Sequence, residues 1–224
     1  MVAMTKRDVP DPPGRPLVVS FTSRSVNISW APTQHTHYSP VTHHIIHTRV
    51  GETGEWMDGI LTINNDTHFV VPNLKPFTVY SFRVFAVNAM GTSNPSMESY
   101  YTVTLREDPS GKPTIITAHN TSATALFISW RPPLRQTIHG EFLGYRISYR
   151  PRDHPEEATK QIYIRNPSAE SYIIDRLETY TQYLVSLQVF NPEGIGPKTT
   201  VLVMTDEGAT IIEVRHRPLV ASTR

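Results

Sequence analysis

An internal repeat constrains the fold of this chain more than any other feature. Residues 26–32 and 126–132 both contain the pattern Ile-Ser-Trp-x-Pro, in which a short apolar stretch ends in tryptophan and is followed by proline. The two tryptophans, Trp30 and Trp130, lie 100 positions apart. A repeat of this kind indicates the architecture before any element is assigned, because each copy should build the same fold. The 224 residues are therefore expected to form two domains of ordinary size.

Further landmarks recur downstream in the same order. In each copy a leucine stands six positions before a tyrosine, and eight positions after that tyrosine an asparagine opens a glycine-containing loop. These landmarks are Leu74, Tyr80 and Asn88 in the first copy and Leu177, Tyr183 and Asn191 in the second. Between tyrosine and asparagine the residues alternate between apolar and polar, as a half-buried antiparallel strand requires. Short strands separated by Gly, Pro and Asn predict an all-β chain of two tandem antiparallel β-sandwiches.

The connector between the copies is short and rich in proline, glycine and charge. It reads Glu-Asp-Pro-Ser-Gly-Lys-Pro over residues 107–113. We expect the first domain to span residues 10–108 and the second to span residues 109–206. The tail, residues 207–224, is expected to be poorly ordered or non-native.

The landmarks together resemble the fibronectin type III family, whose domains have an immunoglobulin-like fold. The resemblance covers about nine-tenths of the chain. It implies that Trp30 and Trp130 lie in the structural core. It also implies that the hydroxyls of Tyr80 and Tyr183 bond to upstream backbone at a corner between strands.

Residues 183–206, with their Asn-Pro-Glu-Gly loop, more closely resemble the fibronectin repeats of sidekick-type adhesion proteins of the immunoglobulin superfamily. This resemblance implies a non-enzymatic extracellular binding or spacer module in a plasma-membrane receptor or adhesion protein, supporting cell-cell adhesion in nervous tissue. Its partners would be other proteins, including homophilic ones bound through the parent chain. The alternative is a cytoplasmic scaffold segment of the sarcomeric or cytoskeletal kind, because giant muscle proteins carry the same landmarks.

Composition and the lack of motifs argue against other classes of function. A net charge of +1 with no basic run disfavours nucleic-acid binding. The chain has no cysteine, so it has no disulfide, thiolate metal site or cysteine nucleophile. We find no catalytic or phosphate-binding motif, and therefore expect no enzyme, catalytic residue, cofactor or metal. No stretch approaches the roughly 20 apolar residues of a membrane-spanning helix, so we expect no membrane insertion by this segment.

Three acceptor motifs for N-linked glycan occur, at Asn27, Asn65 and Asn120. They favour the secretory pathway and predict a glycoprotein. Asn27 alternates with apolar neighbours on a predicted strand, so its side chain is expected to point to solvent.

Half of the ten histidines lie between residues 35 and 47. Alignment of the two copies sets His43 against Tyr145 and His47 against Tyr149 in the sequence. These two histidines are expected to be half-buried near the sandwich rim, and they are candidate pH-sensitive groups because burial lowers the pKa of an imidazole.

The loops that follow the two landmark asparagines are the candidate binding loops. Neither contains Arg-Gly-Asp. Their glycines, Gly91 and Gly194, are expected to form turns with positive φ. The candidate residues are Met90, Gly91 and Thr92 in the first copy and Glu193, Gly194 and Ile195 in the second.

Overall fold

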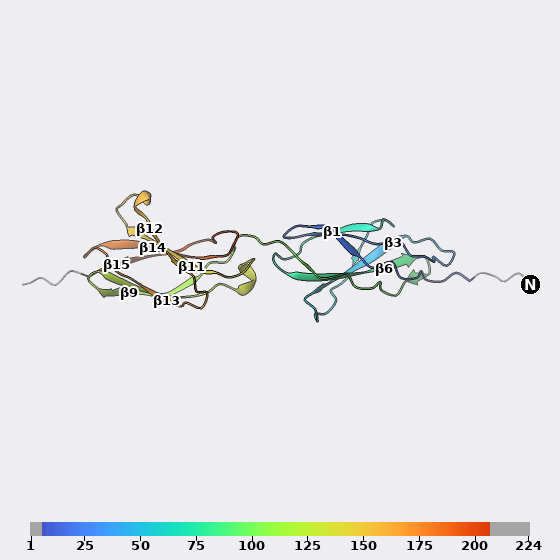
Figure 1. The fold of residues 1–224 in the computed structure, drawn as a ribbon, viewed down its shortest axis with the longest axis horizontal. Helices are drawn as coiled ribbons and strands as arrows, with labels where there is room; N and C mark the ends of the chain where they lie inside the picture. Colours follow the sequence, from blue (N-terminus) through green and yellow to red (C-terminus); the bar gives the residue numbers. More distant parts are fainter. Residues whose placement is uncertain (1–5, 207–224) are drawn as a thin grey trace, which may run out of the picture. The chain divides into compact units, whose positions relative to one another are not determined.

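The computed structural model describes residues 6–206 and divides the chain into two compact units, Met1–Asp108 and Pro109–Arg224 (Figure 1). The division falls within the predicted connector, residues 107–113. The predicted tail, residues 207–224, lies outside the described residues. We call the two units the first and second domain and describe each by itself.

The first domain has two antiparallel sheets. One has the strand order β1 (Leu17–Phe21), β2 (Val26–Ser29) and β5 (His68–Val71). The other has the order β4 (Ile60–Leu61), β3 (His43–Val50), β6 (Val79–Asn88) and β7 (Gly91–Thr92), and β8 (Thr102–Val103) also pairs with β6.

The second domain repeats this plan. Its smaller sheet has the order β13 (Ser171–Ile174), β10 (Ala125–Arg131) and β9 (Thr114–Ser122). Its larger sheet has the order β12 (Lys160–Ile164), β11 (Gly144–Pro151), β14 (Gln182–Phe190) and β15 (Thr199–Met204). Two short 3-10 turns, η1 (Arg135–Thr137) and η2 (Glu156–Ala158), complete the described elements. The predicted all-β sandwich fold is confirmed.

The core of each domain follows from the alternation along its strands. In β2 and β10 every second residue is buried, and the tryptophan that follows each pattern is 5% exposed at Trp30 and 2% at Trp130. Tyr80 and Tyr183 belong to the same core clusters. Each buried aromatic side chain removes a large apolar area from water, and the aliphatic residues around it complete the core.

Each landmark tyrosine forms a corner with upstream backbone. The Lys75 amide donates to the Tyr80 hydroxyl oxygen at 2.8 Å, and the Glu178 amide donates to that of Tyr183 at 2.9 Å. The chain can turn tightly here because the residue three positions before each tyrosine adopts a left-handed backbone conformation. Those residues are Phe77, with φ 45°, and Tyr180, with φ 49°.

The expected alignment of His43 with Tyr145 is wrong by one residue. His44 pairs with Ala86 on β6, six positions after Tyr80, and Tyr145 pairs with Val189 on β14, six positions after Tyr183. His44 is therefore the counterpart of Tyr145. A slip of one position moves every side chain of a strand to the other face. The run His-His-Ile-Ile-His does not alternate in polarity, so the sequence left the facing direction of β3 undetermined.

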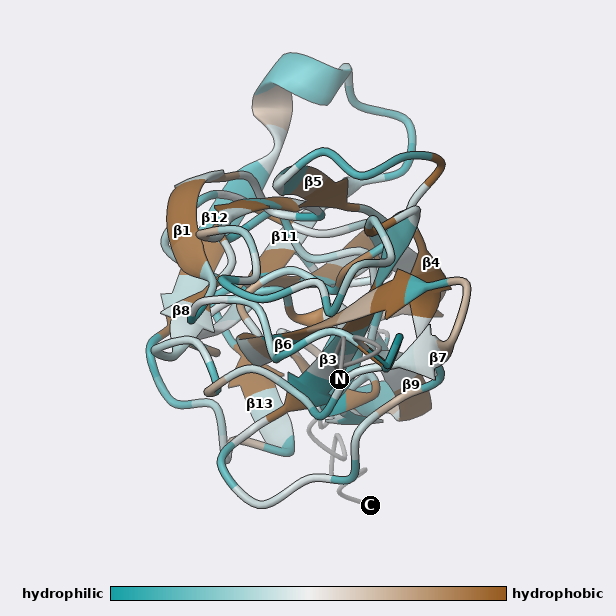
Figure 2. Cartoon of the chain, turned by 90° about the vertical axis from the view of Figure 1, so that its right-hand side faces the viewer, coloured by the Kyte–Doolittle hydropathy of each residue, from teal (hydrophilic) through white to brown (hydrophobic). Residues whose placement is uncertain are grey.

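The edge strand β1 carries apolar side chains at the surface. Leu17, Val19 and Phe21 are 56%, 62% and 43% exposed, and Figure 2 colours this strand as hydrophobic. Because β1 pairs only with β2 in its sheet, this edge is accessible in the isolated chain.

We predict that Tyr80→Phe and Tyr183→Phe each lower the free energy of unfolding of their own domain by about 1 kcal/mol, because a partly buried amide loses its acceptor. Urea titration followed by hydrogen exchange and mass spectrometry reads the two domains separately. Tyr101→Phe and Tyr163→Phe, at residues 50% and 47% exposed, are the matched controls and should leave stability unchanged. Equal effects at control and corner positions would contradict the prediction.

Candidate functional site

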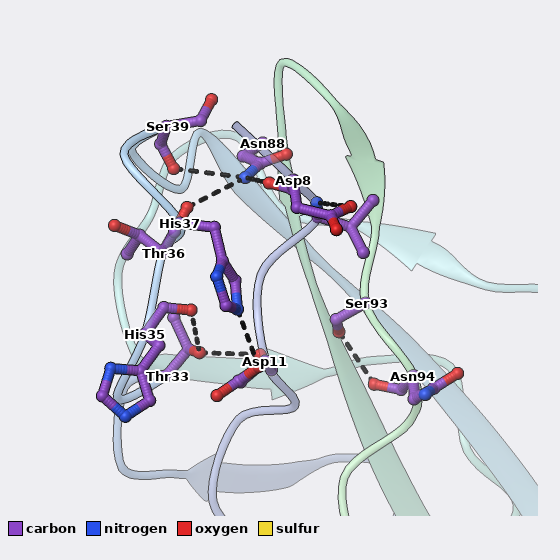
Figure 3. A network of polar contacts seen from close by, with 11 residues as sticks. Asp8, Asp11, Thr33, His35, Thr36, His37, Ser39, Asn88, Ser93 and Asn94 are labelled. Atoms are coloured by element: carbon purple, nitrogen blue, oxygen red, sulfur yellow. Dashed lines mark hydrogen bonds and ion pairs between the residues drawn. The ribbon is translucent and has the colours of Figure 1, made fainter. Parts of the chain in front are cut away.

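The landmark asparagine Asn88 organises one end of the first domain (Figure 3). Its side-chain nitrogen lies 2.9, 3.3 and 3.2 Å from the carbonyl oxygens of Asp8, Thr36 and Ser39. Its side-chain oxygen accepts the amide of Met90 at 2.8 Å and that of Gly91 at 3.2 Å. A single buried side chain thus ties together the N-terminal segment, the loop before β3 and the candidate binding loop.

Asn191 makes the corresponding hydrogen bonds in the second domain. Its side-chain nitrogen donates to the Ile138 carbonyl at 2.7 Å, and its oxygen accepts the amides of Glu193 and Gly194 at 2.9 and 3.0 Å. Charge-free hydrogen bonds of this kind order a loop from inside and leave its outer surface free for contact.

The candidate binding loops differ in their exposure and in their turns. Met90 is 48% exposed, and Glu193 is also exposed, whereas Ile195 is half-buried and forms an isolated bridge with Phe190. The other candidates in these loops are Gly91, Thr92 and Gly194. Gly91 has φ 141°, as expected. The expectation of positive φ at Gly194 is wrong. The two turns differ in this respect although the landmark asparagine accepts two successive amides in both.

The loop before β3 has a strained backbone close to Asn88. His37 and Tyr38, two consecutive residues other than glycine, have φ values of 50° and 59°. The His37 ring nitrogen Nε2 lies 3.0 Å from Asp11 Oδ1, and the Thr33 hydroxyl donates to the Asp11 carbonyl at 2.7 Å (Figure 3). Tyr38 is 69% exposed. Left-handed conformations at such residues are retained where the surrounding contacts enforce them, and they cluster at binding sites.

A hollow of about 360 Å³ lies under this loop, and His44 forms part of its wall. The imidazole is 2% exposed, and its Nδ1 has no hydrogen-bond partner among residues 6–206. It packs edge-on against Trp30 with ring centroids 5.1 Å apart. In the second domain Tyr145 makes the corresponding contact with Trp130, also at 5.1 Å.

Burial and charge shape the histidines of β3. Burial, with a smaller contribution from His43, lowers the pKa of His44. Burial and the Arg83 charge lower the pKa of His47, and Asp58 opposes this effect. His43 and His47 are half-buried, as expected, and both lie on the outer face of the sheet. The core histidine of the strand is His44.

A third tryptophan, which lies outside the repeat, covers the outer face of β3 and β6. The guanidinium carbons of Arg49 and Arg83 lie 4.6 and 4.4 Å from the centroid of a Trp56 ring. Arg49 also pairs with Glu98, and Arg83 contacts His47 Nδ1. Sequence reasoning missed this cluster. The only signal was a tryptophan without a counterpart in the second copy.

The three glycan acceptors lie in different environments. Asn65 is exposed in the turn between β4 and β5, and it lines the hollow beside His44. Asn120 is half-buried near the end of β9. Asn27 alternates with the buried Val26 and Ile28 as expected, but it is half-buried in the middle strand of its sheet. Its Oδ1 atom is buried and has no hydrogen-bond partner within residues 6–206.

The described chain contains neither a metal-like cluster nor a membrane-spanning helix. Within residues 6–206, no three His, Asp or Glu side chains gather as metal ligands would. In the same part of the chain, no helix has the length and apolar character to cross a membrane.

Comparison with known proteins identifies the repeated domain. The family described as "Fibronectin type III domain" matches residues 11–102 and 111–205. A putative receptor-type tyrosine-protein phosphatase, mosPTP-1 of Aedes aegypti, is 62% identical over 211 residues. Sidekick-2 of Mus musculus is 34% identical over 220 residues, so the predicted resemblance to sidekick-type proteins is confirmed.

The chain matches only part of each relative. It covers 16% of the length of the Aedes phosphatase and 10% of that of mouse sidekick-2, while 93% and 88% of the chain itself are matched. Only the fibronectin region of the phosphatase is covered, so its enzyme domain is not in this chain. The crystal structure of the chicken CNTN1 FN1-FN3 domains has a TM-score of 0.69 at 26% identity, covering 89% of this chain and 67% of that one.

We predict that acidification destabilises the first domain through His44. In the unfolded chain the imidazole titrates near its ordinary pKa of 6.5, and in the folded domain its pKa is lower. The unfolded chain therefore binds the proton first, so stability is complete above about pH 6.5 and is lost as the pH falls below that value. His47, whose pKa is also lowered, adds to the loss in the same direction.

The variant His44→Tyr, which copies the second domain, should reduce this pH dependence and leave only the share of His47. Urea unfolding of the first domain at pH 7.5 and pH 5.0 measures it. His68→Tyr, on an exposed strand position, is the matched control and should behave as wild type. An unchanged pH dependence in His44→Tyr would show that the buried imidazole is not responsible.

Proposed function

The chain belongs to the fibronectin type III family, and from that premise we propose that it is an extracellular binding or spacer module of a plasma-membrane receptor or adhesion protein, serving cell-cell adhesion in nervous tissue. Fibronectin type III domains are non-catalytic modules, and we propose no enzymatic role for this segment. We propose that the module consists of two domains, residues 10–108 and residues 109–206.

The observation that carries the proposal is the match of both domains in tandem to receptor and adhesion proteins. Relatives with this pair include a receptor-type phosphatase, sidekick proteins and the cell adhesion molecule Dscam1 of Drosophila melanogaster. Tandem sandwiches with a short connector suit a spacer that holds other domains away from a membrane. The partners are proteins, with homophilic contact through the parent chain as one form.

The surface chemistry of the first domain supports the same proposal. The exposed acceptor Asn65 meets the requirement for glycan attachment, which occurs in the secretory pathway. Loops that are ordered from inside by Asn88 and Asn191 offer stable surfaces for protein contact without further folding. We propose the loops at residues 90–92 and 193–195 as those contact surfaces.

We predict that secretion from eukaryotic cells gives a folded protein with the highest glycan occupancy at Asn65 and lower occupancy at Asn27 and Asn120. The order follows the exposure of the three side chains, because the transferase must reach the side-chain nitrogen. Peptide mass spectrometry before and after enzymatic removal of glycan measures each occupancy.

The matched variants are Asn65→Gln, which should remove the dominant glycan, and Asn27→Gln, which should lower the mass of the secreted protein by less than Asn65→Gln does. Empty sites throughout, or glycans that prevent folding, would contradict the extracellular proposal and favour the cytoplasmic scaffold.

The placement in nervous tissue has its own test. An antibody raised against this pair of domains should stain intact, unpermeabilised neurons of the source animal more strongly than muscle cells. Staining that requires permeabilisation, or that follows the sarcomere, would overturn this part of the proposal.

A further inference from the structure

The two domains differ most on the outer face of their larger sheets. In the first domain Trp56 covers this face, and Glu98 neutralises Arg49. The equivalent face of the second domain, formed by β11, β12, β14 and the residue before β15, instead holds an open hollow of about 400 Å³. Three cations line it, Arg146, Arg150 and Lys198, together with one acid, Glu156. We call it the basic hollow.

The three cations are spread over the hollow. Arg146 and Arg150 are four residues apart on β11, which places their backbones about 13 Å apart along the strand. Arg146 pairs with Gln188 on β14. The register of β14 with β15, continued by one residue, places Lys198 opposite Gln188 on the other side. Arg146 and Lys198 are thus two strands apart, or about 10 Å. These separations exceed the size of one phosphate or sulfate group and suit a chain of anionic groups.

Neutral groups hold the two guanidinium groups in place. Arg146 donates to the side-chain oxygen of Gln188 at 2.7 Å, and the Gln188 side-chain nitrogen in turn donates to the Gly196 carbonyl at 2.6 Å. Gln188 is 8% exposed, so it is a fixed support. Arg150 donates to the carbonyls of Arg152 at 3.1 Å and His154 at 2.7 Å.

In the described part of the chain, the charges of these cations are not offset by ion pairs, although Glu156 lines the same hollow. Within residues 6–206, none of its three cations has a carboxylate oxygen within 4.0 Å, whereas Arg49 in the first domain has one. Cations that are held in position without a counter-charge attract an anionic ligand and lose little side-chain entropy on binding it.

We propose that the basic hollow binds a sulfated glycosaminoglycan. The remaining wall supplies hydroxyl and amide groups, including Ser148, Thr159 and Gln161, which suit the hydroxyls of a sugar chain. No aromatic ring lines the hollow, so it lacks the stacking platform on which single-stranded nucleic acids bind. The choice of an extracellular polyanion as the ligand rests on the function proposed above. The arrangement of the charges is independent of that function.

The test is surface plasmon resonance with the intact two-domain chain over immobilised heparin. Single variants Arg146→Gln and Lys198→Gln should weaken binding by roughly twofold to fivefold, as expected for solvated ion pairs. The triple variant with Arg150→Gln should abolish it. Removal of the opposing charge in Glu156→Gln should strengthen it. Binding by the wild type should fall roughly twentyfold to fortyfold between 50 and 200 mM salt, as expected if about three charges release counterions.

Matched controls keep the result specific. Arg131→Gln removes an exposed charge from the other sheet of the domain and should bind as wild type does. Arg150→Lys keeps the positive charge but loses the guanidinium group that holds the loop carbonyls. Heparin binding by this variant separates the effect of the charge from an effect on folding, and circular dichroism checks that the domain is folded. Equal losses in Arg131→Gln and the hollow variants would overturn the proposal.

The ligand class is tested on the same surface. Heparin should bind more tightly than desulfated heparin, hyaluronan or oligo-dT DNA. Equal binding of DNA, or no heparin binding at all, would overturn the glycan assignment. This measurement needs neither secretion nor glycosylation. If the chain binds heparin while its glycan acceptor sites stay empty, the proposed heparin site is supported and the extracellular proposal fails.

Discussion

The contact between the two sheets of each domain, made by a tryptophan and the residue opposite it, supports the rest of the structure. Trp30 packs against His44 and Trp130 against Tyr145, each with ring centroids 5.1 Å apart. Close packing of this kind sets the spacing and direction of the sheets, and any change in the opposing residue must be accommodated nearby. A smaller, ionisable ring at residue 44 accompanies a hollow beneath a strained loop in the first domain.

The same scaffold therefore carries two different surfaces. In the first domain the outer face of the larger sheet is covered by a stack of arginine and tryptophan, and the distinctive features lie at the loop end around Asn88. In the second domain that face is open and basic, because no residue takes the place of Trp56 and the arginines there are held by Gln188 and by backbone carbonyls. Duplication kept the core and left the outward positions free to differ.

The difference between the outer surfaces of the two domains fits the proposed module of a receptor or adhesion protein. The buried asparagines keep the loops in one conformation, and the hollows and exposed strand β1 offer separate surfaces for contact. Relatives that contain this pair are receptors and adhesion molecules of which it forms only a small part. The contribution that we propose for this pair is therefore one of spacing and contact.

The amino-acid sequence by itself determined the duplication and the all-β fold, since these follow from local spacing and period-two alternation. Its resemblance to the fibronectin type III family then located the core tryptophans and the corner tyrosines. It could not determine which way β3 faces, because His43, His44 and the isoleucines beside them do not alternate in polarity. Only the tertiary structure decided that His44 is the core histidine, that Trp56 meets Arg49 and Arg83, and that Asn27 is partly covered. Each of these depends on contacts between residues far apart in the chain, which local patterns do not encode.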